Sequence, residues 1–157
     1  MKRLIALALT LASVSASAEP NWSVRDLRSQ SGKQFTLAET SVDTSSGTFR
    51  FEVWCPPSGP LVQIRFPIIM AQPGTPAWVR VSIDEGEPLK VAARSSKVDT
   101  HVLALDPQHI HAVLDRIAQG RVASVQASSA DGKLMTFNLD AEGFAEQFKS
   151  LRKRCGL

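Results

Sequence analysis

The two cysteines, Cys55 and Cys155, are the residues best suited to covalent chemistry in this chain of 157 residues. Neither belongs to a C-x-x-C pair, and no histidine lies near either of them in the sequence, so nothing nearby would activate a catalytic thiol. Two cysteines alone also make an incomplete zinc site. In an exported chain, two cysteines most simply form one disulfide bond. We therefore expect a Cys55–Cys155 bond that closes a loop of about 100 residues and stabilises the fold by roughly 4–5 kcal/mol in the chain-entropy model.

The other reactive side chains form no recognisable catalytic or metal-binding pattern. The three histidines are His101, His109 and His111. The last two are two positions apart on a predicted helix, so they do not share a face. The acidic stretch Asp84–Glu87 lacks the spacing of a calcium loop and is expected to form a solvated hairpin turn. Because the sequence also has no G-x-S-x-G motif and no glycine-rich phosphate loop, we expect a non-enzymatic protein without metal or cofactor.

Tryptophans and arginines on one face of the predicted strands are the candidate binding residues. Alternation in the strands 49–55, 61–66 and 78–83 places them opposite the apolar side chains. This set consists of Arg50, Trp54, Arg65, Trp78 and Arg80. Such residues are enriched at binding hot spots and could stack on sugar rings or bind carboxylates. The alternative is that another layer covers this face, so that the tryptophans are ordinary packing with arginines laid across them.

Residues 1–18 have the features of a secretory signal peptide. Lys2 and Arg3 are followed by the apolar run 4–11 and by the small-residue site 16–18, so we expect cleavage after Ala18 and a periplasmic or secreted protein. The apolar run is too short to span a bilayer, and we expect no membrane insertion after cleavage. Two of the 18 Lys and Arg residues lie in this leader, which leaves 16 against 15 Asp and Glu. This balance gives no reason to expect nucleic-acid binding.

The remaining chain is predicted to form an irregular N-terminal arm over residues 19–33 and a single α+β domain over residues 34–157. Strands are expected at 35–38, 49–55, 61–66, 78–83, 89–93, 101–105, 121–127 and 134–139. One helix should begin at Asp106-Pro107 and end at Gly120, and the last should follow Asp140. This order predicts an antiparallel sheet or a β-sandwich with two helices, the C-terminal one tied on by the disulfide.

The layout from residue 49 to residue 155 resembles small exported bacterial accessory proteins. The segments that carry the likeness are "VRVSIDEGEP" and the tail "TFNLDAEGFAEQFKSLRKRC", a strand followed by an amphipathic helix that ends at a cysteine. The pattern is similar to the type VI secretion-associated VasI-like family and, less closely, to the invasion-associated locus B family, which usually has more cysteines. The resemblance implies an accessory or interaction role in the cell envelope.

The expected function is therefore binding to another envelope component, with a protein as the partner. Two alternatives stay open. One is binding of peptidoglycan or a small ligand through the tryptophan and arginine face. The other is an inhibitor or immunity-type protein that blocks an enzyme with a rigid proline-flanked loop.

Overall fold

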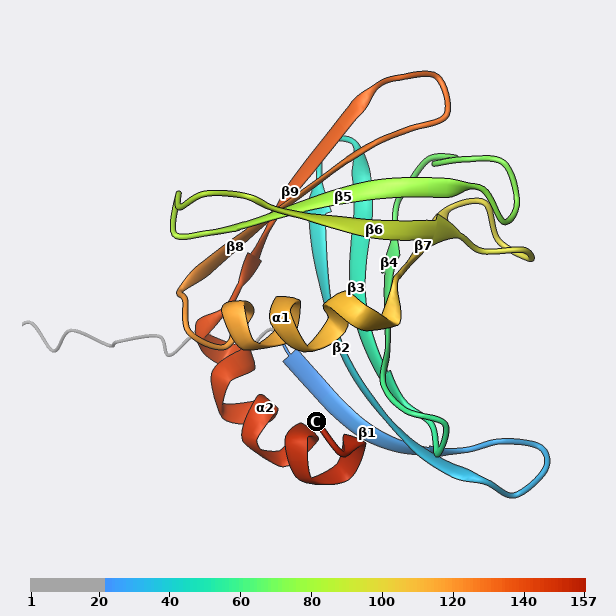
Figure 1. The fold of residues 1–157 in the computed structure, drawn as a ribbon, viewed down its shortest axis with the longest axis vertical. Helices are drawn as coiled ribbons and strands as arrows, with labels where there is room; N and C mark the ends of the chain where they lie inside the picture. The colour runs from blue at the N-terminus through green and yellow to red at the C-terminus, as the bar shows by residue number, and fades with distance from the viewer. Residues whose placement is uncertain (1–21) are drawn as a thin grey trace, which may run out of the picture.

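The fold is a single, strongly curved antiparallel sheet with two short helices, seen in a computed structural model that describes residues 22–157 (Figure 1). The nine strands of this part of the chain are β1 Trp22–Arg28, β2 Gln34–Thr44, β3 Gly47–Cys55, β4 Leu61–Arg65, β5 Pro76–Ile83, β6 Leu89–Ser95, β7 Val102–Leu105, β8 Val122–Ser128 and β9 Leu134–Asp140. The helices are α1 Pro107–Ile117 and α2 Glu142–Cys155. The expected signal peptide, residues 1–18, and its cleavage site lie outside the described residues.

The sheet has the strand order β1-β2-β3-β4-β7-β6-β5-β8-β9 and forms a half-barrel. The predicted α+β class, with a β-sandwich as its variant, is wrong, because the described chain is mainly β and its strands belong to one sheet. The physical reason is curvature. A strongly twisted sheet curves around a core on its own concave side, so it needs no second sheet, and the two helices complete the cover of that core. Both helices are short and pack across this concave side.

The N-terminal segment is the second correction. Residues 19–33 were expected to form an irregular arm, but residues 22–28 form β1, which pairs with β2 in the register Trp22↔Thr40 to Arg28↔Gln34. β1 is an edge strand, and only Trp22 of its seven residues is buried. The alternation of apolar and polar residues that marks a strand is therefore weak in this segment. Its anchor is Trp22, which is buried against Phe51 and Phe144, with ring centroids 5.9 Å and 4.5 Å away.

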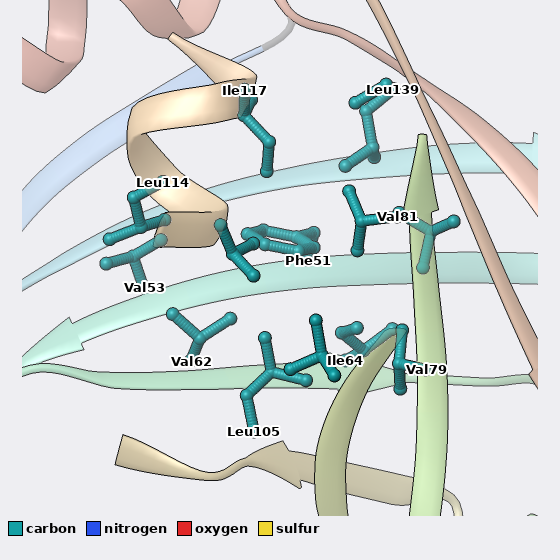
Figure 2. Packing of buried hydrophobic residues seen from close by; sticks show 14 of the residues in the cluster. Phe51, Val53, Val62, Ile64, Val79, Val81, Leu105, Leu114, Ile117 and Leu139 are labelled. Carbon is teal, nitrogen blue, oxygen red and sulfur yellow. The ribbon is translucent and has the colours of Figure 1, made fainter. Parts of the chain in front are cut away.

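The core fills the concave side of the sheet. Figure 2 shows residues from several strands and α1 converging there: Phe51, Val53, Val62, Ile64, Val79, Val81, Leu105, Leu114, Ile117 and Leu139. The strand residues among them alternate with outward-facing neighbours, as a sheet with one buried face requires. Helix α1 begins where it was predicted and ends at Ile117, before the predicted Gly120. The Asp106 carboxylate accepts the Gln108 N–H at 3.1 Å, Pro107 occupies the first turn, and the predicted apolar stripe is buried.

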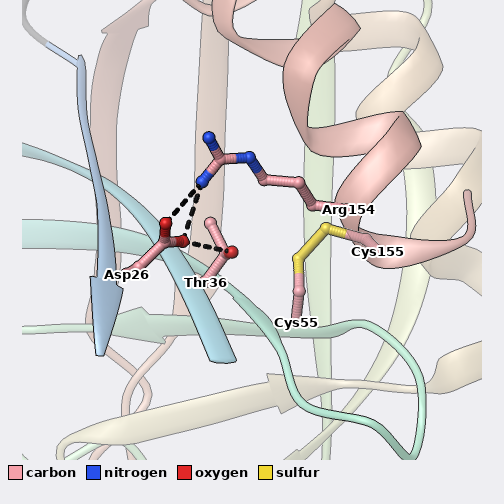
Figure 3. Close-up of a disulfide and its surroundings, with 5 residues drawn as sticks. All are labelled: Asp26, Thr36, Cys55, Arg154 and Cys155. Carbon is pink, nitrogen blue, oxygen red and sulfur yellow. Dashed lines mark hydrogen bonds and ion pairs between the residues drawn. A yellow bond between two sulfur atoms is a disulfide. The ribbon is translucent and has the colours of Figure 1, made fainter. Parts of the chain in front are cut away.

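The C-terminal helix is tied to the sheet as predicted. Cys55, at the end of β3, is bonded to Cys155, at the end of α2, with their Cα atoms 5.0 Å apart (Figure 3). Phe144, Phe148 and Leu151 form the buried stripe of α2. Asp140 Oδ1 accepts the N–H of Glu142 at 3.1 Å, although the cap position itself is Ala141. The disulfide therefore links the last element of the fold to an interior strand of the sheet.

Candidate binding face

The five predicted binding residues point away from the core but do not form one surface. Arg50 and Trp54 lie on β3 and Arg65 on β4, whereas Trp78 and Arg80 lie on β5. Strands β4, β7 and β6 lie between β3 and β5 in the sheet. Neighbouring strands are about 4.8 Å apart, so the curved sheet separates β5 from β4 by roughly 14 Å and from β3 by roughly 19 Å. The outer face therefore carries two distinct groups of side chains.

The arginines on β3 and β4 are paired with acidic side chains. Arg50 lies directly opposite Arg65 in the ladder, and each has a carboxylate beside it. Arg65 Nη1 contacts Asp99 Oδ2 at 2.5 Å, and Arg50 Nη1 lies 3.9 Å from Glu52 Oε1. The hydrogen bond from Arg65 is the main reason why the pKa of Asp99 is lowered. These two arginines are thus locally neutralised and have little free charge for a partner.

Trp54 is a packing residue of the outer face. Its ring stacks on Phe35 of β2 with centroids 5.5 Å apart, and its Nε1 donates to Glu52 Oε2 at 2.9 Å. Its cross-strand neighbour Leu37 is 2% exposed even though it faces outward. Trp54, Phe35 and Leu37 therefore form a small apolar cluster on the convex side, in which Trp54 is partly buried. This side chain fits the packing alternative better than the binding one.

Trp78 is different, because it is 54% exposed. The Nζ atom of Lys90, from β6, lies 4.3 Å from the centre of its ring. On the same face, Arg80 lies directly opposite Lys90 on one side and Gln126 of β8 on the other. These side chains and Leu134 of β9 line a hollow of about 250 Å³. We call the surface formed by Trp78, Arg80, Lys90, Gln126 and Leu134 the Trp78 patch.

The Trp78 patch carries the positive charges of Arg80 and Lys90. Within residues 22–157, the recorded ion pairs do not include Arg80 or Lys90. Sequence reasoning found Trp78 and Arg80 but missed Lys90, Gln126 and Leu134. Lys90 could have been found, because the hairpin predicted at residues 84–87 brings the strand 89–93 beside Arg80. The other two depend on the neighbours of β5 in the sheet, which the sequence does not reveal.

The acidic hairpin between β5 and β6 is exposed as expected, yet it has a structural role that the sequence did not predict. Asp84 Oδ1 accepts the N–H groups of Arg121 at 3.1 Å and Val122 at 2.9 Å. The bond from Val122, followed by that from Arg121, lowers the pKa of Asp84. Asp84 and Glu85 both have positive φ, 47° and 64°, which suits a tight hairpin turn. Asp84 thus anchors the start of β8 to the β5–β6 hairpin.

The surroundings of the disulfide indicate a structural bond. Figure 3 shows Arg154, next to Cys155, reaching across to Asp26 of β1. Arg154 Nη1 lies 2.8 Å and 2.9 Å from the two carboxylate oxygens, and Thr36 Oγ1 donates to Asp26 Oδ1 at 2.7 Å. The Thr36 bond and then the Arg154 bond lower the pKa of Asp26. The end of α2 is therefore held by a covalent bond and an ion pair together.

His101 is the histidine that lies beside an acidic side chain in the described residues. Its Nδ1 is 3.3 Å from Oδ1 of Asp99, the carboxylate that also pairs with Arg65. Between Trp22 and Leu157, no three His, Cys, Asp or Glu side chains converge as a metal site would require. In the same part of the chain, no helix has the length and apolar character needed to cross a membrane.

Comparison with known proteins gives a likeness of fold. No protein family and no curated protein matches the sequence. Among solved structures, the chain is similar to the crystal structure of invasion associated protein B from Bartonella henselae, with a TM-score of 0.59 and 14% sequence identity over 85% of this chain and 91% of that chain. This likeness supports, at the level of the fold, the second of the two resemblances found in the sequence. The resemblance to the VasI-like family has no such support.

Proposed function

We propose that this protein is a non-enzymatic accessory protein of the cell envelope that binds another envelope protein through the Trp78 patch. It acts in the periplasm after cleavage near Ala18. The observation that carries the proposal is the half-exposed indole of Trp78, which lies beside Arg80 and Lys90 on the uncovered convex face of the sheet. An aromatic side chain next to cationic groups is the composition found at hot spots of protein interfaces.

Several features support this proposal. The disulfide and the Arg154–Asp26 ion pair hold the C-terminal helix on the sheet, which gives a rigid scaffold suited to an oxidising compartment. The fold neighbour is named for its association with invasion, which is consistent with an envelope protein. Trp54, by contrast, is covered by Phe35 and is not part of the proposed interface.

Binding of the cell wall is the second candidate function. The hollow of about 250 Å³ beside Trp78 favours it, because an exposed indole at the edge of a hollow can stack against a sugar ring. The inhibitor alternative stays a prediction from the sequence. The proline-flanked loop before β5 is held against β6, since Thr75 N donates to Ser95 Oγ at 3.0 Å and Arg94 Nη1 to the Gly74 carbonyl at 2.7 Å.

Crosslinking in intact cells tests the proposed function. A tagged full-length copy is crosslinked, purified and analysed by mass spectrometry. We expect one dominant envelope protein, whose capture is lost in Trp78→Ala and kept in Trp54→Ala. Both variants remove an indole, so Trp54→Ala is the matched control, and circular dichroism checks that each variant is folded.

Two results would contradict the proposal. The first is a wild-type protein that captures no envelope protein. The second is a capture that Trp78→Ala leaves unchanged. Sedimentation with purified peptidoglycan distinguishes the second candidate function, which predicts that the protein sediments with peptidoglycan and that Trp78→Ala abolishes this.

A further inference from the structure

We infer that the Trp78 patch binds an acidic segment of its protein partner, with carboxylates held by Arg80 and Lys90 and an apolar side chain resting between Trp78 and Leu134. This inference rests on the proposed function and names the chemistry of the partner. It is carried by the distribution of charge on the convex face, by the position of Lys90 over Trp78 and by the exposure of Leu134.

The first argument is the difference between the two halves of the convex face. On β1 to β4, three outward arginines form ion pairs: Arg25 with Glu39 at 2.7 Å, Arg50 with Glu52, and Arg65 with Asp99. On β5, β6 and β8, the outward positions include Arg80, Lys90 and Arg94 and no acidic residue. Arg94 donates to the Gly74 carbonyl, a neutral acceptor, at 2.7 Å. This half of the face is therefore positive and attracts an acidic partner.

The second argument is that two cations face each other directly. Arg80 and Lys90 are cross-strand neighbours, an arrangement that destabilises a sheet when both side chains carry the same charge. No carboxylate within residues 22–157 relieves the repulsion. A carboxylate from a partner, placed between the two groups, accepts charge-assisted hydrogen bonds from both and removes this cost.

The third argument concerns the ring of Trp78. Lys90 Nζ lies 4.3 Å from the ring centre in a cation–π contact. A sugar that stacked on this face of the indole would have to displace the ammonium group. A carboxylate binds the ammonium group from its solvent side and leaves the cation–π contact in place. The patch therefore suits an acidic protein segment better than a stacked glycan.

The fourth argument is the apolar border of the patch. Leu134, at the start of β9, is 57% exposed and lines the same hollow as Trp78. The amide of Gln126, which lines the same hollow, is held on β9, because its Nε2 donates to Thr136 Oγ1 at 3.2 Å. An apolar side chain of the partner thus finds two apolar neighbours, while the carboxylates beside it reach the cations.

The test uses the mature protein and a synthetic peptide of six glutamates with one central leucine. The chain has three tryptophans, whose indole N–H signals are followed by two-dimensional NMR, and Trp78→Phe identifies the Trp78 signal. We expect the peptide to shift the Trp78 signal and to leave the signals of Trp22 and Trp54 in place. Affinity should fall as salt is raised, because the contact is electrostatic and exposed.

Charge reversal provides the matched comparison. The double variant Arg80→Glu/Lys90→Glu should lose at least about tenfold in affinity for the peptide. The double variant Lys149→Glu/Lys153→Glu makes the same change in net charge on exposed positions of α2 and should stay within about twofold of wild type. Equal losses in the two double variants, or a peptide that leaves the Trp78 signal unmoved, would overturn the inference. Purified peptidoglycan that shifts this signal when the peptide does not would also overturn it.

Crosslinking with the same variants separates this inference from the proposed function. Partner capture that is lost in Trp78→Ala but survives in Arg80→Glu/Lys90→Glu would overturn the acidic-segment inference while the proposed function stands. Failure of the wild type to capture any envelope protein would remove the proposed function itself. Capture that is lost in both Trp78→Ala and the charge-reversed variant, and kept in the α2 control, supports both.

Discussion

The indole Nε1 of Trp22 donates a hydrogen bond to the main-chain carbonyl of Asp140 at 2.6 Å, and this bond joins the first and last strands across 118 residues of sequence. β1 and β9 are the two edges of the sheet, so Trp22 links them where the half-barrel would otherwise be open. The same ring packs against Phe144 of α2, whose centroid is 4.5 Å away. One side chain thus couples both sheet edges to the C-terminal helix.

We expect Trp22→Phe to lower the free energy of unfolding by about 1–3 kcal/mol, because the core loses part of a buried ring and the part-buried hydrogen bond to the Asp140 carbonyl is removed. Urea unfolding at neutral pH measures this change. Trp78→Phe is the matched control and should stay within about 0.5 kcal/mol of wild type, since the side chain of Trp78 is 54% exposed. Equal stability of Trp22→Phe and wild type would show that the edge contact contributes nothing.

The disulfide should account for a large part of the stability. Cys55→Ala/Cys155→Ala opens a loop with a sequence separation of 100, and we expect a loss of roughly 4–5 kcal/mol from the chain-entropy model. Urea unfolding of the double variant measures it. Mature protein from the periplasm should also show no thiol that reacts with an alkylating agent after denaturation, and two thiols after reduction. Two labelled thiols without reductant would be incompatible with the bond.

Gly120 lies between α1 and β8. The space that a side chain at this position would need is already filled by Ile83, at the end of β5. A Cβ atom at Gly120 would lie 2.0 Å from Cγ2 of Ile83, so Gly120→Ala forces the two segments apart. We expect a loss of about 1–3 kcal/mol from this overpacking, measured by thermal unfolding. Adding Ile83→Ala removes the clashing methyl group, so it should make Gly120→Ala less harmful than it is in the wild-type background. Additive losses in the double variant would contradict this account.

The stability should depend on acid through Asp84. Its pKa is lowered in the fold by the N–H groups of Val122 and Arg121, so its ionised form is favoured by folding. The stabilisation is present above the ordinary pKa of 3.8 and is lost as the pH falls through the lower pKa of the folded state. We therefore expect Asp84→Ala to be less stable than wild type at pH 7 and the difference to shrink near pH 2.5.

Urea unfolding of both proteins at several pH values provides this measurement. Glu85→Ala is the control, since the N–H groups of Arg121 and Val122 donate to the carboxylate of Asp84. If the difference in free energy of unfolding between Asp84→Ala and wild type stayed constant from pH 7 to pH 2.5, the charge of this carboxylate would have no role in stability.

Arg80 should cost stability in the free protein. Because it faces Lys90 across the ladder, Arg80→Glu replaces a repulsive pair with an attractive one, and we expect a gain of about 0.2–1 kcal/mol. The gain should decrease in high salt, since both side chains are exposed. Urea unfolding at low and high salt checks both statements. A loss of stability in Arg80→Glu would mean that the two cations do not repel each other appreciably.

Much of the fold and part of the candidate site could be predicted from local features of the chain. Alternation in residues 49–55 and 78–83 showed which side chains face away from the core, because neighbours in a strand always point to opposite sides. The Asp106-Pro107 cap located α1 for an equally local reason. The disulfide followed from the expected compartment and from there being only two cysteines.

What the sequence by itself determined is therefore where most strands and both helices lie, which face of those strands is apolar, and which cysteines are bonded. Only the tertiary structure decided the strand order and the curvature of the sheet, because both depend on pairing between segments far apart in the chain. That order puts three strands between Trp54 and Trp78, covers the first with Phe35 and leaves the second beside Arg80 and Lys90. The tertiary structure also made β1 part of the fold, since Trp22 is anchored by contacts with Asp140 of β9 and Phe144 of α2.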